Sequence, residues 1–96
     1  MTQALNYTEA QIEAIIKAQV VQEFMYDRES DLLTNDYLLI EQGIIDSMGI
    51  IRMIGLLEDQ FGIIIDPEDF LLESFETINA IKTLVMTKLA GEDNES

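Results

Sequence analysis

Apolar residues recur at every third or fourth position in three separate stretches of this sequence, and this is the spacing of one face of an α-helix. The stretches predict helices over about residues 8–25, 47–61 and 77–90. The side chains expected to face the core are Ile12, Ile15, Ile16, Val20 and Phe24; Ile51, Ile54, Leu57 and Phe61; and Ile78, Ile81, Val85 and Leu89. The short apolar run of residues 63–65 could form a strand, but nothing nearby offers a partner strand. We therefore expect an all-α fold.

Residues at the ends of these stretches have the properties of helix caps. Thr8 followed by Gln11 fits a capping box, in which each side chain accepts a hydrogen bond from the backbone N–H of the other residue. Ser47 stands where the second helix begins, so we expect it to be the N-cap, with its oxygen turned toward free backbone N–H groups. Gly62 suits the left-handed conformation that follows many helices. Gly91 is expected to end the last helix.

Two connections complete the predicted fold. Residues 27–46 show no sustained period, and a connection of this length is unusual in a small domain. Its leucines can pin it to the core, so we expect an ordered loop with room for a helical turn. Asp66 followed by Pro67 and two acidic residues is typical of a helix start, and it predicts a short helix over about residues 67–72. The expected architecture is an all-α bundle of three longer helices and one short helix, with a long first loop.

The composition favours a folded, strongly acidic domain. The chain has 96 residues, of which 48% are hydrophobic, so we expect one domain over residues 1–96, ordered from about 8 to 90, with a frayed tail over 91–96. Acidic residues outnumber basic ones by 19 to 5, which gives a formal charge of −14. Nucleic acids and anionic membranes are poor partners for such a surface, because contacts to phosphate need Lys and Arg. Basic protein surfaces are good partners, since the field attracts them.

The residue types that are missing argue against an enzyme. The chain has no cysteine and no histidine, so it lacks a thiolate nucleophile, a thiolate metal site and the commonest general base. No apolar run approaches the length that spans a bilayer. The first ten residues lack the basic start and apolar run of a signal peptide, so a cytoplasmic protein is the simple interpretation.

Four segments carry a family resemblance. They are the run from Leu39 to Met48, which ends in Asp-Ser-Met; the run from Leu57 to Ile63, with Phe-Gly-Ile; the acidic Pro turn of residues 66–70; and the Thr-Ile start of residues 77–81. In this order and at these distances they resemble acyl carrier proteins over about residues 8–90. A lone Asp-Ser before a helix would be weak evidence, because Ser is a common N-cap. The four segments together make the resemblance specific.

The resemblance implies a prosthetic group and a set of partners. Ser47 would be esterified by 4′-phosphopantetheine, which a phosphopantetheinyl transferase takes from coenzyme A. The arm ends in a thiol, which would hold acyl or aminoacyl groups as thioesters, so the cofactor would supply the sulfur that the sequence lacks. Asp46 is expected to help the transferase dock. The other implied partners are an acyl- or aminoacyl-activating ligase and downstream transferases or synthases, and the protein is expected to be monomeric and without catalytic activity of its own.

The same resemblance implies a partner-facing surface along the second helix. Its expected members are Met48, Arg52, Gly55, Glu58, Asp59 and Ile64. Gly49 is placed with Gly55 on this outer face by the helical wheel, and two small residues there suggest that something approaches closely.

The first turns of the second helix differ from those of many fatty-acid carriers. Those carriers have acidic residues there, whereas this chain has Gly49, Ile50 and Arg52. The sequence Asp46-Ser47-Met48-Gly49 is closest to D-alanyl carrier proteins and stand-alone aminoacyl or peptidyl carriers. The resemblance therefore favours a specialised carrier with its own ligase over a carrier of the housekeeping fatty-acid pathway.

Three questions stay open at this stage. A helical adaptor without a cofactor, which binds a basic protein through the acidic surface, would fit the composition equally well. A calcium sensor is disfavoured, because residues 66–69 lack the alternating ligands and central glycine of an EF-hand loop. Cargo could enter a cleft lined by Ile51, Ile54, Ile65 and Ile78, although a closed, dry core is the default for a protein interior.

Overall fold

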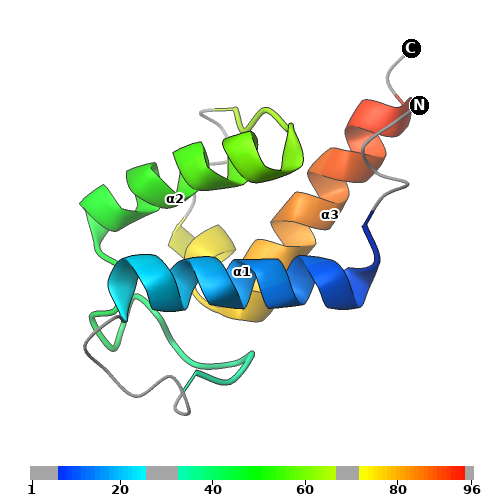
Figure 1. The fold of residues 1–96 in the computed structure, drawn as a ribbon. Coiled ribbons are helices and arrows are strands. Elements are labelled where there is room, and N and C mark those ends of the chain that lie inside the picture. The colour runs from blue at the N-terminus through cyan, green and yellow to red at the C-terminus, as the bar shows by residue number, and fades with distance from the viewer. Residues whose placement is uncertain (1–6, 26–32, 67–71, 95–96) are drawn as a thin grey trace.

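The helices of this protein pack on one another around a single apolar core, without strands in the part of the chain that is described. The computed structural model describes residues 7–25, 33–66 and 72–94, and only the backbone of residues 91–94. The elements are α1 (Glu9–Phe24), α2 (Ser47–Phe61), the 3-10 turn η4 (Leu72–Phe75) and α3 (Ile78–Asn94), as Figure 1 shows. The expected all-α class is confirmed. None of the helices in these ranges is long and apolar enough to cross a membrane.

The first helix begins as the sequence predicted. The Thr8 hydroxyl accepts a hydrogen bond from the Gln11 N–H at 3.1 Å, and the Gln11 side chain accepts one from the Thr8 N–H at 2.8 Å. This reciprocal pair satisfies two of the N–H groups that a helix start leaves without an intrahelical partner.

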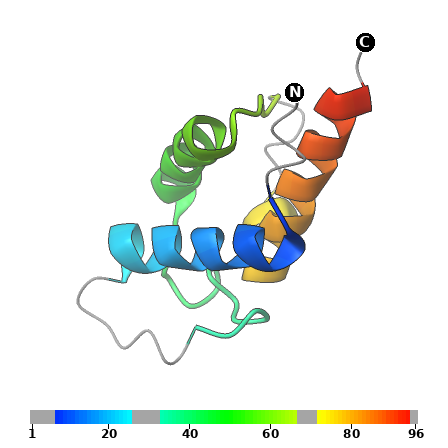
Figure 2. The same cartoon turned by 45° about the vertical axis from the view of Figure 1, so that its right-hand side comes forward.

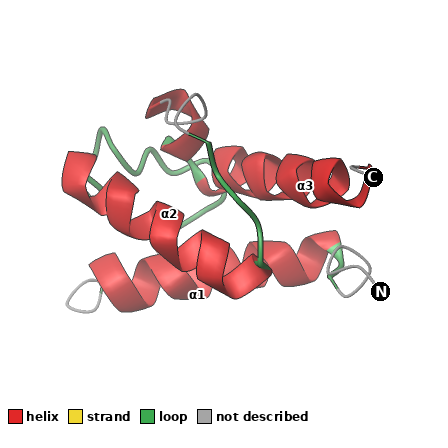
Figure 3. Ribbon diagram, turned by 90° about the horizontal axis from the view of Figure 1, so that it is seen from above, coloured by secondary structure: helices red, strands yellow, loops and turns green. Residues whose placement is uncertain are grey.

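Seen from above, α2 crosses over α1, and α3 lies beside α1 (Figure 3).

The core is apolar throughout the described residues. Its members come from all three helices, from η4 and from both connections, and the largest that are fully buried are Phe61, Phe75, Ile16, Met25 and Leu39. No charged or polar residue of the described ranges is buried. The ring of Tyr7 packs edge-on against the ring of Phe61, with the centroids 5.0 Å apart.

The connection before α2 is held against the start of α3, on the side of α1 opposite α2 (Figure 2). The Leu39 N–H donates to the Glu76 carbonyl at 2.8 Å, and the Asn79 N–H donates to the Asn35 carbonyl at 3.1 Å. Leu33 is buried as well. Over residues 33–46 the expected ordered loop is therefore confirmed, but it consists of turns and contains no helix. Residues 27–32, the rest of the predicted loop, lie outside the described residues.

A set of charged side chains joins α1 to α3. Lys82 on α3 lies 3.0 Å from a Glu13 carboxylate oxygen and 3.1 Å from one of Glu9, and only 13% of its side chain is exposed. These hydrogen bonds raise the pKa of Lys82, with that from Glu13 contributing most. The Lys82 bond, followed by one from Asn35, lowers the pKa of Glu13. We call Glu9, Glu13 and Lys82 the charged seam.

Two predicted boundaries differ from the structure. The last helix does not end at Gly91 but continues to Asn94, because a glycine inside a helix costs only about 1 kcal/mol relative to alanine. Most of the predicted short helix of residues 67–72 lies outside the described residues. The described part of this region is the 3-10 turn η4, which starts at Leu72.

Candidate functional site

The start of α2 brings together the residues that carry the motif. Asp46, rather than Ser47, is the N-cap: its Oδ1 accepts a hydrogen bond from the Gly49 N–H at 2.8 Å, and its backbone is extended. Ser47 is the first residue of the helix. The prediction that Ser47 caps α2 was therefore wrong by one residue. The reason is that aspartate and serine are equally good caps, and the aspartate comes first.

Because Asp46 is the cap, the serine hydroxyl makes no capping contact with the described residues. Ser47 is exposed, and among residues 7–25, 33–66 and 72–94 no hydrogen bond to its hydroxyl is found. An alcohol that accepts a phosphate ester must be reachable and must not be needed by the fold. The Ser47 hydroxyl therefore fits covalent attachment of a phosphate-linked group, through an ester to Oγ.

A close approach to α1 fixes the first turn of α2. Gly49 is buried, and a Cβ added to it would lie 3.0 Å from Ile45 Cγ2 and 3.1 Å from Phe24 Cε1. A second glycine of the same helix, Gly55, is exposed, and an added Cβ there would meet nothing within 4 Å. The placement of Gly49 on the outer face was therefore wrong, although the inference that something comes close to it was correct: its close neighbours are Ile45, just before α2, and Phe24 of α1.

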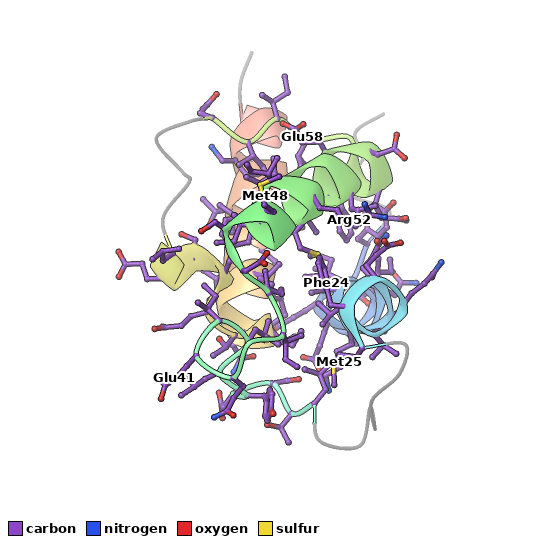
Figure 4. All side chains as sticks on the ribbon, turned by 90° about the vertical axis from the view of Figure 1, so that its left-hand side faces the viewer. Phe24, Met25, Glu41, Met48, Arg52 and Glu58 are labelled. Atoms are coloured by element: carbon purple, nitrogen blue, oxygen red, sulfur yellow. The ribbon has the colours of Figure 1, made fainter. Side chains whose placement is uncertain are left out.

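One ion pair also links these two helices. Arg52 Nε donates to Glu23 Oε1 at 2.8 Å, and Arg52 Nη2 lies 2.6 Å from the same oxygen. Figure 4, in which α1 is seen nearly end-on, shows Arg52 on the side of α2 that faces α1. Both charges of this pair are thus engaged within the molecule.

The buried stripe of α2 differs from the predicted one at a single position. Ile54, Leu57 and Phe61 are buried as expected, but Ile51 is 59% exposed. Ile50 takes its place in the core, because Ile50, Met53, Leu57 and Phe61 also follow helical spacing. Two adjacent isoleucines make both registers fit, and the sequence pattern alone cannot choose between them.

The other predicted partner-facing residues fall into two groups. Met48 is 73% exposed and Ile64 is 67% exposed, and Asp59 and Gly55 are exposed as well. Glu58, by contrast, is half-buried, and its Oε2 accepts a hydrogen bond from the Ile65 N–H at 2.9 Å. Glu58 therefore holds the segment after α2 in place.

Three of the four residues expected to line a cargo cleft are buried, and the fourth is not. Ile54, Ile65 and Ile78 belong to the core and are at most 6% exposed, whereas Ile51 is 59% exposed. Ile51 is thus removed from the lining of any internal cleft and joins Met48 on the outside. This is the surface residue that the sequence pattern missed, and the signal that could have found it is the alternative register through Ile50.

Comparison with known proteins identifies this constellation. The family model described as a phosphopantetheine attachment site matches residues 15–85, which is well over half of the chain and includes all of α2. A search of curated proteins gave no significant match to the chain. The all-α fold of the described residues is consistent with this family. The chain therefore belongs to the phosphopantetheine attachment site family, as a carrier protein whose cofactor is covalently bound 4′-phosphopantetheine.

Proposed function

We propose that Ser47 is the attachment point, and that the protein carries acyl or aminoacyl groups to partner enzymes. The observation that supports this most directly is the exposed Ser47 hydroxyl, without a hydrogen bond among the described residues, on the first residue of α2. When bound, 4′-phosphopantetheine supplies a terminal thiol on which such groups are held as thioesters. The protein itself would perform no catalysis.

The residues around Ser47 would present its hydroxyl in a fixed position. Asp46 caps the helix through Oδ1, and α1 packs against Gly49 in the next turn. These contacts hold the backbone on both sides of Ser47 while its side chain stays reachable. Asp46 is itself exposed, so its second oxygen, Oδ2, could contact the phosphopantetheinyl transferase.

The chemistry around the site favours a specialised carrier. The first turn of α2 contains no acidic residue, and the cap is followed by serine, methionine and a buried glycine. We therefore propose a D-alanyl, aminoacyl or peptidyl type of cargo, loaded by a dedicated adenylate-forming ligase and passed to downstream transferases or synthases. Assays of the phosphopantetheine-loaded protein against a panel of such ligases would identify the cargo.

Attachment is tested by reconstitution. Purified protein is incubated with coenzyme A and a broad-specificity phosphopantetheinyl transferase, and its intact mass is measured. The expected result is a mass gain of one phosphopantetheine for the wild type and none for Ser47→Ala. Ser74→Ala is the matched control, because Ser74 is a half-buried serine of η4 and should not affect the gain. A wild type that stays unmodified while correctly folded would support the alternative, an acidic adaptor that binds a basic protein without a cofactor.

A further inference from the structure

The end of α1 contacts the first two turns of α2 through two consecutive residues. Phe24 Cε1 would lie 3.1 Å from a Cβ added to Gly49, and Glu23 Oε1 accepts a hydrogen bond from Arg52 Nε at 2.8 Å. Figure 4 shows Phe24 and Arg52 between the two helices. The next residue, Met25, is 1% exposed, and its N–H closes the last turn of α1, so this end of α1 is itself held in the core. We call Glu23 and Phe24 the clamp.

The sequence of α2 offers the core a second apolar register. Ile50 is 8% exposed and Ile51 is 59% exposed, although both isoleucines follow helical spacing. Exchanging one isoleucine for the other hardly changes the apolar area that is buried, so the core alone distinguishes the two registers weakly. Consecutive residues are about 100° apart around a helix axis. A rotation of α2 that buried Ile51 in place of Ile50 would therefore turn Ser47 as well, toward the side on which the buried Met53 lies.

The clamp is compatible with only one of these two registers. The same rotation would bring Ile50 to the position that Gly49 now has, where Phe24 leaves no room for a side chain. It would also turn Arg52 away from Glu23 and break a charge-assisted hydrogen bond, which is stronger than a neutral one. The clamp therefore opposes the rotation in two ways, by steric exclusion and by attraction.

We infer that Glu23 and Phe24 are positioning residues for the modification of Ser47, because they select the register of α2 in which this serine is exposed. This rests on the proposed function of Ser47. Neither clamp residue would touch the reacting atoms, since they act through Arg52 and Gly49. Molecules in the other register would not present the hydroxyl, so the rate of modification scales with the fraction that is held in the clamped register.

The register can be read from the exposure of Ile50 and Ile51 without any substitution in α2. The isoleucine methyl groups are labelled with ¹³C, a soluble paramagnetic agent is added, and the broadening of each methyl signal is measured by NMR. In the wild type, the Ile51 methyl signal should broaden and that of Ile50 should stay sharp. Unfolding would broaden both signals, whereas a change of register broadens that of Ile50 and protects that of Ile51.

Two substitutions weaken the clamp in different ways. Phe24→Ala removes the steric exclusion, and Glu23→Arg replaces the attraction for Arg52 by repulsion, so the second variant keeps the test valid if the first does not fold. In both variants, the broadening should shift from Ile51 toward Ile50. The transferase should modify them with a lower kcat/KM, about tenfold lower in a variant where about a tenth of the molecules keep the clamped register.

A charge swap and a distant contact are the controls. Arg52→Glu added to Glu23→Arg restores an ion pair and should restore the methyl pattern of the wild type. Tyr7→Phe keeps the aromatic ring but removes the hydrogen bond from the Tyr7 hydroxyl to the Gln60 carbonyl, which is 3.1 Å long and lies at the other end of α2. Its methyl pattern and its kcat/KM should both equal those of the wild type.

The remaining outcomes separate this inference from the carrier function. If the clamp variants keep the methyl pattern of the wild type, or change it and are still modified with an unchanged kcat/KM, the clamp does not position Ser47 and the inference is overturned, whereas the carrier function stands. If no protein gains mass, attachment at Ser47 fails. The methyl signals then still decide the register: a changed pattern supports the role of the clamp in α2, and an unchanged one contradicts it.

Discussion

The exposed apolar side chains of α2, Met48 and Ile51, contrast with the charged seam between α1 and α3. In the seam, Lys82 is almost covered and satisfied by two carboxylates of the same chain. On α2, Met48 and Ile51 are exposed and nothing in the described chain covers them. Some charged side chains of this acidic protein therefore form ion pairs that join two helices, whereas apolar side chains are exposed close to Ser47.

This difference shows that net charge is a poor guide to the local chemistry of a site. The formal charge of −14 suggests that any partner would meet carboxylates. Along α2, Arg52 is paired with Glu23 and Glu58 is hydrogen-bonded to the backbone, whereas the exposed Asp46 next to Ser47 caps the helix through Oδ1 alone. The long-range field and the contact surface are thus separate properties of this molecule, and they can be tested separately.

The largest effect should distinguish two isoleucines of the same helix. Ile54→Ala removes a side chain that is 6% exposed, and truncations of this kind cost about 2–5 kcal/mol of unfolding free energy. Ile51→Ala removes one that is 59% exposed and should cost no more than about 0.5 kcal/mol. Urea unfolding followed by circular dichroism measures both. Equal losses would mean that Ile51 belongs to the core, as the sequence pattern first indicated, and not to the exposed face of α2.

The two glycines of α2 test the contrast between the face of α2 that packs on α1 and its exposed face. Gly55→Ala adds a methyl group in open space and should stabilise the helix by up to about 1 kcal/mol. Gly49→Ala gains the same helix propensity but presses on Ile45, which is 1% exposed, and on Phe24. We expect Gly49→Ala to be less stable than Gly55→Ala by about 1 kcal/mol or more. If the two variants are equally stable in thermal unfolding, α1 does not fix the first turn of α2.

The smallest expected effect concerns the seam and depends on pH. Lys82→Gln should lower the urea midpoint near neutral pH, because it leaves Glu13 and Glu9 without their cation. The lowered pKa of Glu13 means that its contribution is complete above the pKa of an unfolded glutamate and is lost as the pH falls through the folded value. The raised pKa of Lys82 means that its contribution is complete below the pKa of an unfolded lysine and is lost as the pH rises through the folded value.

The difference between wild type and Lys82→Gln should therefore be greatest between these limits and shrink in acid and in alkali. Lys17→Gln is the control, because Lys17 is more exposed and lies 3.9 Å from Glu13. Its midpoint should hardly change. A difference for Lys82→Gln that does not vary with pH would show that packing of the lysine stem, rather than the charge, accounts for the effect.

Much of the fold could be predicted from helical spacing and caps, because these are local properties. The capping box of Thr8, the left-handed Gly62 and the extent of α2 agree with the sequence pattern. The connection of residues 33–46 was predicted to be ordered, but the contacts that order it were not predicted. Its backbone hydrogen bonds to Glu76 and Asn79 join residues far apart in the chain. No local pattern contains that information.

For the site, the sequence motif indicates Ser47 as the attachment point, which stays a prediction, but the local details differ from the expectation. The cap of α2 is Asp46, because two capping residues stand side by side. Gly49 could not be recognised as a packing glycine, since the residue that approaches it, Phe24, belongs to another helix. The helical spacing placed Ile51 in the core, although Ile50 next to it fits helical spacing equally well. Only the packing of α2 on the other helices decides between the two.

The most direct test of the account is tandem mass spectrometry of the protein isolated from cells that make it. We predict that the peptide containing Ser47 carries one phosphopantetheine, with or without a thioester-bound group, and that the fragment ions assign it to Ser47. Finding this peptide entirely unmodified, or finding the group on another residue, would contradict the central claim that Ser47 of α2 is the attachment point.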